Sequence, residues 1–202
     1  MKRAYSVQNL LDAKFKTIDL QGEWHDAIGT PELTGSWFIF GAPKNGKTSF
    51  AMKLAKELTK YKRVVYNSVE EGFSLTIKEQ LRRSEMKDVK GKFVLIQENI
   101  PEMTTFLSKK KSPNVVIIDS IQFAQMNFKE YKDLKKQFPD KLFVFVSHIK
   151  GKEPDGDTAK KIWRDANVTF KVEHFRAFPV SRYGGGKPID VSTEKAIEYF
   201  GE

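Results

Sequence analysis

The chain has 202 residues, of which 35 are Lys or Arg and 26 are Asp or Glu, so its formal net charge is +9. This length suits one α/β domain with a sizeable core and is too short for two. The lack of cysteine excludes disulfides and thiolate metal sites and fits a reducing compartment. The positive balance favours a polyanionic partner such as nucleic acid, although a merely lysine-rich surface accounts for the charge equally well.

The N-terminal sequence does not resemble a signal peptide. Met1, Lys2 and Arg3 are followed by polar residues rather than by an apolar run, and no stretch approaches membrane-spanning length. We therefore expect a cytoplasmic protein with no membrane partner. We also expect one domain over residues 1–202, with a lead-in at 1–34 that packs against the core, a core at 35–184 and a C-terminal tail at 185–202.

The first predicted elements flank a glycine-containing loop. Residues 36–40 form an apolar, β-prone run, and from Phe50 to Leu58 apolar residues recur at helical spacing. The intervening residues 41–48, Gly-Ala-Pro-Lys-Asn-Gly-Lys-Thr, fit the phosphate-binding pattern of Gly, four residues and Gly-Lys-Ser/Thr. Strand, glycine loop and helix is the order that this motif requires, which disfavours the alternative of a turn with an incidental lysine. The sequence therefore predicts a nucleoside triphosphate site.

Each residue type of this motif has a separate role. Glycines let backbone N–H groups approach phosphate oxygens, Lys47 is expected to reach the β- and γ-phosphates, and the Thr48 hydroxyl is expected to coordinate Mg²⁺. The predicted nucleotide-binding residues are Gly41, Ala42, Pro43, Lys44, Asn45, Gly46, Lys47, Thr48 and Ser49.

The remaining elements alternate along the chain. Short apolar runs predict strands at 64–68, 93–96, 115–118, 142–146, 168–172 and 175–180, and amphipathic segments predict helices at 75–86, 101–107 and 121–138. Residues 150–161, rich in Lys, Gly, Asp, Glu and Pro, are predicted to be a mobile loop. This order predicts an α/β fold with a mainly parallel sheet, helices on both faces and antiparallel strands near the C-terminus.

Polar residues follow three of the predicted strands, at the edge where a parallel sheet binds its ligands. Asp119 is predicted to hold Mg²⁺ together with Thr48, with a helix N-cap as the alternative. Glu70 is predicted to accept a proton from an attacking water, with Glu71 as the competing candidate and a solvated acidic turn as the alternative to both. His148 is predicted to sense the γ-phosphate, although a lone histidine could also be structural.

Several cations suit contacts outside this edge. Arg182 lies beyond the last predicted strand, and it is either an arginine finger for a neighbouring subunit's phosphates or a surface arginine beside a turn. Lys150, Lys152, Lys160 and Lys161 lie on the predicted loop and suit contact with nucleic-acid phosphates. The acids among them weaken this interpretation, and no aromatic residues are interleaved there for base stacking.

Together these motifs resemble the RecA-like ATPase family, especially its RadA, DnaB-helicase and KaiC branches. The resemblance rests on the loop at 41–48, on Tyr-Asn-Ser-Val-Glu-Glu at 66–71, on Val-Ile-Ile-Asp-Ser-Ile-Gln at 116–122 and on Ser147-His148 at the sensor position. It implies ATP as the nucleotide, Mg²⁺ as the metal, and hydrolysis at the subunit interfaces of a ring or filament. It also implies that DNA is bound by loops near residues 125–136 and 150–161.

The sequence departs from the family pattern in places that bear on partners. Val180 stands where related ring ATPases carry a lysine before the finger arginine, and RadA's zinc-binding cysteines have no counterpart. The resemblance therefore implies a bare motor core, to which a partner protein could supply loading or specificity. We expect an ATPase that binds DNA, with single strands favoured, and couples hydrolysis to recombination, repair or strand handling. The alternative is a slowly hydrolysing switch or scaffold that acts on a protein partner.

Overall fold

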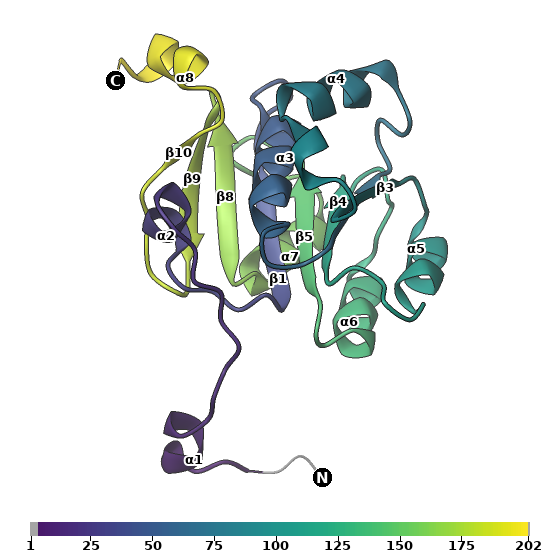
Figure 1. The fold of residues 1–202 in the computed structure, drawn as a ribbon, viewed down its shortest axis with the longest axis vertical. Coiled ribbons are helices and arrows are strands. Elements are labelled where there is room, and N and C mark those ends of the chain that lie inside the picture. The colour runs from purple at the N-terminus through teal and green to yellow at the C-terminus, as the bar shows by residue number, and fades with distance from the viewer. Residues whose placement is uncertain (1–3, 202) are drawn as a thin grey trace.

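The computed structural model describes residues 4–201, and a mostly parallel eight-stranded sheet runs through its centre (Figure 1). The strand order is β10-β9-β8-β1-β5-β4-β2-β3. The strands are β1 Gly35–Phe40, β2 Val64–Ser68, β3 Phe93–Ile96, β4 Val115–Asp119, β5 Leu142–Ser147, β8 Val168–Glu173, β9 Arg176–Ser181 and β10 Ile189–Asp190. Only the pairs that β9 forms, with β8 and with β10, are antiparallel within this sheet. The strands β6 Ile149–Lys150 and β7 Glu153–Pro154 form a separate hairpin.

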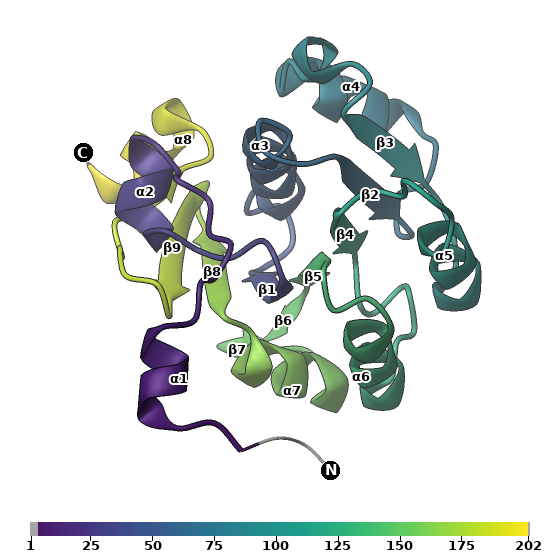
Figure 2. The ribbon, with the colours of Figure 1, turned by 60° about the horizontal axis from the view of Figure 1, so that its bottom comes forward.

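Helices cover both faces of the sheet (Figure 2). The described helices are α1 Val7–Leu11, α2 Glu23–Ile28, α3 Lys47–Leu58, α4 Leu75–Arg83, α5 Ile100–Leu107, α6 Phe128–Gln137, α7 Asp157–Asp165 and α8 Thr193–Phe200, with one 3₁₀ helix at Met86–Val89. Apolar residues of α2, α3 and α4 pack on one face, and those of α5, α6 and α7 pack on the other. None of the described helices is long and apolar enough to cross a membrane.

The sheet separates the core into two apolar layers. In β1, Trp37 and Ile39 pack into the layer shared with α3, whereas Phe38 and Phe40 pack into the layer shared with α6 and α7. A strand that is buried on both faces needs apolar side chains at every position, and β4 and β5 are likewise buried along their whole length. The predicted mainly parallel α/β fold is therefore confirmed.

The helix predicted at 121–138 is wrong in its first third. The helix α6 begins only at Phe128, because the Asn127 side chain accepts hydrogen bonds from N–H groups of its first turn. The preceding residues form turns, and among them Ile121 and Met126 are buried in the same layer as α6, whereas Phe123 is exposed. The apolar spacing that suggested a longer helix therefore reflects a packed turn.

The mobile loop predicted at 150–161 is also wrong. The β6–β7 hairpin and the first half of α7 occupy this segment. Ala159 and Ile162 of α7 are buried against the sheet, and Lys160 forms an ion pair of 2.7 Å with Glu153 of the hairpin. The charged residues at 157–161, which suggested a loop, lie on the solvent face of α7. An amphipathic helix needs only a few apolar residues to pack against a sheet.

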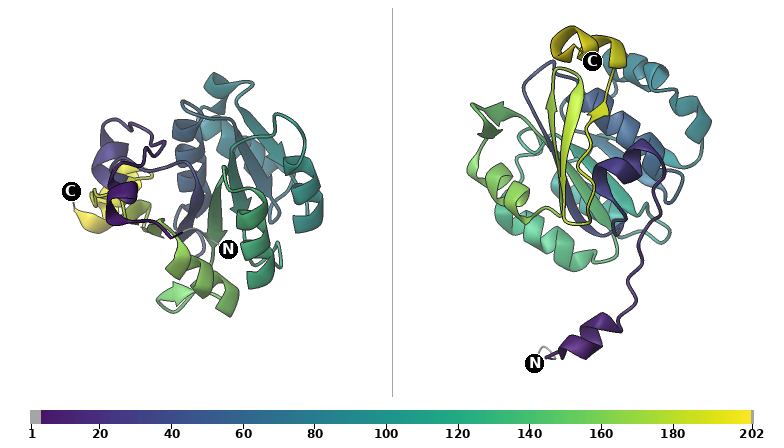
Figure 3. Two further views of the ribbon diagram at one scale, coloured as in Figure 1. Left: turned by 90° about the horizontal axis from the view of Figure 1, so that it is seen from below. Right: turned by 90° about the vertical axis from the view of Figure 1, so that its left-hand side faces the viewer.

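The two ends of the described chain differ in how they pack. The sequence predicted no element within residues 185–202, yet β10 joins the sheet and α8 lies against the turn between β8 and β9, where the His174 ring stacks on Tyr199 with centroids 3.9 Å apart. Within residues 4–34, Trp24 of α2 is buried. The helix α1 instead projects away from the body (Figure 3), and none of its residues is buried.

Candidate functional site

The loop between β1 and α3 has the backbone that a phosphate cradle requires. Gly46 has a φ of +93°, in the left-handed region that favours glycine. A Cβ at Gly41 would lie 2.1 Å from the carbonyl oxygen of Val172, so only glycine fits there. No side chain caps α3, and the free N–H groups of its first turn can therefore bind an anion.

Lys47, the first residue of α3, lies inside this loop. Its side chain is 8% exposed, and its Nζ donates to the carbonyl oxygen of Ala42 at 2.9 Å. Burial lowers the pKa of the Lys47 ammonium, and the charges of Asp119 and Glu70 oppose this effect. A buried ammonium inside the loop is well placed to donate to phosphate oxygens.

The turn between β8 and β9 supports the loop from outside. The side-chain oxygen of Asn45 accepts a hydrogen bond from the N–H of His174 at 2.7 Å, and its backbone oxygen accepts one from the N–H of Phe175 at 3.1 Å. The Phe175 ring packs so near Gly46 that a Cβ there would lie 2.9 Å from it. The loop is therefore fixed by a segment far away in sequence.

Asp119 and Thr48 form an oxygen donor pair beside the loop. Asp119 ends β4, and its Oδ2 accepts a hydrogen bond from the Thr48 hydroxyl at 3.3 Å. The buried Tyr66 of β2 donates its phenol proton to the same oxygen. Mg²⁺ prefers hard oxygen ligands and usually takes one or two protein groups together with phosphates and water. The hydroxyl and carboxylate fit that ion, and sequence reasoning had not assigned Tyr66 a part in the site.

Burial dominates the electrostatics of Asp119. It raises the pKa of this carboxyl to about 6, with Glu70 and Glu71 adding to the rise and the Tyr66 hydrogen bond and Lys47 opposing it. Because the pKa in the folded state lies above the ordinary value of 3.8, this group stabilises the fold at low pH. Its contribution is lost as the pH rises through about 6.

We expect Asp119→Asn to remove this pH dependence. The shift from 3.8 to about 6 corresponds to about 3 kcal/mol of unfolding free energy, lost mostly between pH 4 and 6. Urea denaturation from pH 4 to 7.5, without nucleotide or Mg²⁺, should show the wild type losing more stability than the variant over this range. Parallel profiles for the two proteins would contradict the assignment.

We expect Tyr66→Phe to destabilise the protein more at pH 7.5 than at pH 5. At the higher pH the variant leaves a buried, charged Asp119 carboxylate without its phenol donor, which costs about 1–3 kcal/mol. At pH 5 the carboxyl carries its own proton and depends less on that donor. The same denaturation experiment measures both losses. Equal losses at the two pH values would show that the phenol acts only by packing.

Glu70 and His148 meet at the same edge of the sheet. The backbone N–H groups of Val69 and Glu70 both donate to the carbonyl oxygen of Asp119, at 2.9 and 3.1 Å, which fixes the end of β2 beside the end of β4. The Glu70 carboxylate then lies 3.1 Å from Nε2 of His148, directly after β5. The adjacent Glu71 instead accepts a hydrogen bond from Thr76 near the start of α4. Of the two glutamates, Glu70 alone touches the predicted sensor.

A cavity of about 420 Å³ connects these groups. Of the residues predicted from sequence it is lined by Pro43, Lys44, Gly46, Lys47, Thr48, Ser49, Glu70, Asp119 and His148. Glu71, which the sequence offered as an alternative base, also lines it, and so do Arg83, Phe175 and Lys195, which sequence reasoning missed. Arg83 belongs to α4 and Lys195 to α8, and no local motif marks either residue because tertiary packing brings them to the loop.

Arg182 lies at the end of the sheet opposite the phosphate loop. It follows Ser181, which pairs with Val168 at the start of β8, and its N–H donates to the carbonyl oxygen of Asn167 at 3.0 Å. Because β8 runs parallel to β1, the start of β8 is opposite the phosphate loop. Arg182 therefore does not contribute to the cavity of its own chain, and its role toward a neighbouring subunit stays a prediction.

The four predicted nucleic-acid-binding lysines fall into two pairs. Lys150 and Lys152 are exposed on the β6–β7 hairpin, immediately after His148. Lys160 and Lys161 lie on α7, where they form ion pairs with Glu153 at 2.7 Å and with Asp157 at 2.6 Å. The two hairpin lysines are therefore more available to bind a polyanion than the two lysines of α7.

The fold that carries this site is that of the RecA-like P-loop ATPases. The chain is similar to the flagellar accessory protein FlaH from Methanocaldococcus jannaschii, with a TM-score of 0.64, 16% identity and coverage of 89% of this chain and 96% of that one. It is similar to the KaiC-like protein PH0186 from Pyrococcus horikoshii, with a TM-score of 0.59, 15% identity and coverage of 87% and 94%. A third solved structure, described as an ATPase domain, is similar with a TM-score of 0.57, 15% identity and coverage of 82% and 84%. No protein-family model matches the sequence, and no curated protein does.

Proposed function

We propose that the chain binds ATP with Mg²⁺ and hydrolyses it to ADP and phosphate. The observation that carries this proposal is the single cavity lined by Lys47, Thr48, Asp119, Glu70 and His148. These side chains come from the loop helix and from the ends of β2, β4 and β5, and they include a phosphate-binding cation, oxygen donors for a metal and a candidate base. Such convergence at one edge of a sheet is the arrangement that phosphoryl transfer to water requires.

In the proposed mechanism each residue has one task. Lys47 and the N–H groups of the loop bind phosphate oxygens, and Thr48 and Asp119 hold Mg²⁺, which neutralises charge on the phosphates when bound. The Glu70 carboxylate orients a water and accepts its proton. His148, hydrogen-bonded to Glu70 at 3.1 Å, links the position of that carboxylate to β5 and to the hairpin beyond it.

We further propose that DNA binding is coupled to this hydrolysis. The support is the β6–β7 hairpin, which carries the exposed Lys150 and Lys152 directly after His148. DNA bound to these lysines would act on the position of the hairpin and of His148, which contacts Glu70. Single strands are the favoured ligand, and recombination, repair or strand handling is the proposed process. Assembly into a ring or filament would let Arg182 act in a neighbouring cavity.

A second candidate is a nucleotide-dependent switch that acts on a protein partner and hydrolyses slowly. An apolar pocket of about 280 Å³ beside α4 favours it. Phe73 and Leu75 at its border are 96% and 70% exposed, which is unusual for large apolar side chains that lie close together. Both residues follow Glu70 closely in sequence, so binding of a partner protein over them would depend on whether a nucleotide occupies the phosphate cavity.

Phosphate release from ATP separates these possibilities. The wild-type protein is assayed with Mg²⁺, with and without a single-stranded oligonucleotide, at low and high salt. Stimulation that falls steeply with salt supports the DNA-coupled function. Slow release that the oligonucleotide does not change supports the switch, and no release under any condition contradicts the proposed ATPase activity.

A further inference from the structure

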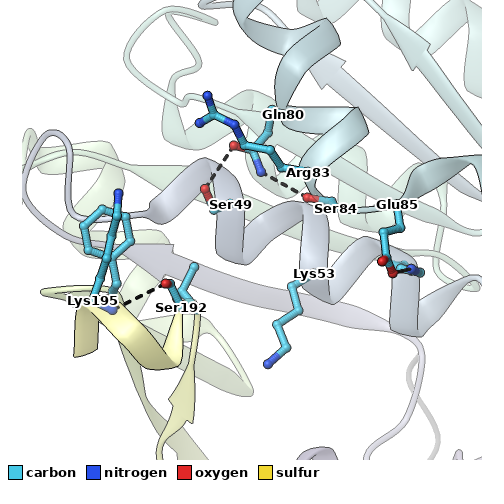
Figure 4. Close-up of a pocket in the computed structure, with 11 residues that line it drawn as sticks. Ser49, Lys53, Gln80, Arg83, Ser84, Glu85, Ser192 and Lys195 are labelled. Atoms are coloured by element: carbon cyan, nitrogen blue, oxygen red, sulfur yellow. Dashed lines mark hydrogen bonds and ion pairs between the residues drawn. The ribbon is translucent and has the colours of Figure 1, made fainter. Parts of the chain in front are cut away.

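The phosphate cavity adjoins a second groove, whose volume is about 550 Å³ (Figure 4). Ser49, Arg83, Phe175 and Lys195 line both spaces. The groove lies between α3 and α4 on one side and the C-terminal β10–α8 segment on the other. None of Glu70, Asp119 and His148 lines it. The shared residues therefore lie where the two spaces meet, and the proposed hydrolytic groups line only the phosphate cavity.

The cations of this groove differ in how their charges are compensated. Lys53 pairs with Glu23 at 2.9 Å, and Lys56 is 3.1 and 3.2 Å from two acids. Within the part of the chain that the structure describes, no acid pairs with Arg83 or Lys195. These two uncompensated cations are also the ones that border the phosphate cavity.

Local contacts hold Arg83 and Lys195 where the groove meets the phosphate cavity. Arg83 is the last residue of α4, and hydrogen bonds from Ser49 to Gln80 and from Gln80 to Ser84, each 3.0 Å, tie the end of that helix to the start of α3. Lys195 lies in the first turn of α8, and its Nζ is 4.4 Å from the centroid of the Phe175 ring. The same Phe175 packs on Gly46 of the phosphate loop.

We propose that Arg83 and Lys195 form a phosphate-binding pair that acts within one chain, on the phosphates that are not transferred. This inference rests on the proposed ATP site. Because the hydrolytic groups line only the phosphate cavity, the transferred phosphate lies there and the α- and β-phosphates lie toward the groove. A guanidinium with no acidic partner among the described residues and a lysine held over an aromatic ring suit oxyanions that remain after hydrolysis. The pair therefore retains ATP and ADP alike.

The inference is tested by Arg83→Ala and Lys195→Ala in the 202-residue chain. Each variant should bind ATP, in the presence of Mg²⁺, and ADP about tenfold more weakly, which is the effect of losing one hydrogen-bonded charge. The turnover number at saturating ATP should fall less than the affinity, because neither residue touches the transferred phosphate. Isothermal titration gives the affinities, phosphate release gives the turnover number, and circular dichroism verifies that both variants fold.

Arg82→Ala is the matched control. Arg82 precedes Arg83 on the same helix, pairs with Glu79 at 2.7 Å and lines neither space, so its removal should leave both affinities unchanged. If wild type and control bind ATP and the two test variants bind it equally well, the inference is overturned while the ATP site stands. A fall in turnover with unchanged affinity also overturns it. If the wild type itself binds no ATP, the proposed function fails and the inference with it.

Discussion

We expect Lys47→Ala to abolish binding of ATP with Mg²⁺. The Lys47 ammonium is buried inside the loop, where two phosphates would share it, and the loss of charge-assisted hydrogen bonds to both weakens binding by at least ~100-fold. The variant also removes a cation whose charge acts together with those of Asp119 and Glu70, so both acids would repel the phosphates more strongly. Titration with a non-hydrolysable ATP analogue measures the change.

Lys60→Ala is the control for this variant. Lys60 lies just beyond the end of α3 and pairs with Glu57 at 2.6 Å, so it tests the loss of one lysine in the same region away from the loop. We expect its affinity for the analogue to equal that of the wild type. Near-normal affinity of Lys47→Ala would show that the loop does not bind phosphate in the proposed way.

The second large effect is expected from Glu70→Gln. The amide keeps the size of the side chain and can still hydrogen-bond His148, but it cannot accept a proton from water. Removal of a general base lowers turnover by ~100-fold or more, whereas ATP affinity should be preserved because Glu70 is not expected to hold the phosphates. Single-turnover phosphate release, together with analogue binding, separates the two properties.

Glu71→Gln distinguishes between the adjacent glutamates. The Glu71 carboxylate accepts a hydrogen bond from Thr76 and should therefore contribute little to turnover. The assignment of the base is wrong if Glu71→Gln stops hydrolysis while Glu70→Gln does not.

The elements that carry the site could be predicted because their signals are local. The glycine loop, the strand before it and the helix after it are contiguous in sequence, and an acid at the end of an apolar strand can only lie at the edge of a sheet. Parallel pairing then brings β2, β4, β5 and β1 together at one end. Lys47, Asp119, Glu70 and His148 therefore line one cavity as expected, and their chemical roles remain predictions.

The contacts that sequence reasoning missed depend on chain direction and distant packing. Because β9 runs antiparallel to β8, the residue that follows it must lie at the edge opposite the phosphate loop, so Arg182 could have been placed from the predicted antiparallel strands. Phe175 and Lys195 reach the loop only through the β8–β9 turn and α8. The start of α6 was missed because the Asn127 cap competes with an apolar spacing that continues across it.

The most direct measurement is calorimetric titration of the wild-type protein with a non-hydrolysable ATP analogue, with and without Mg²⁺. The account predicts saturable binding of one nucleotide per chain that is much tighter when Mg²⁺ is present. No saturable binding at ~1 mM analogue, the upper end of the range in which most enzymes bind substrates, would contradict it.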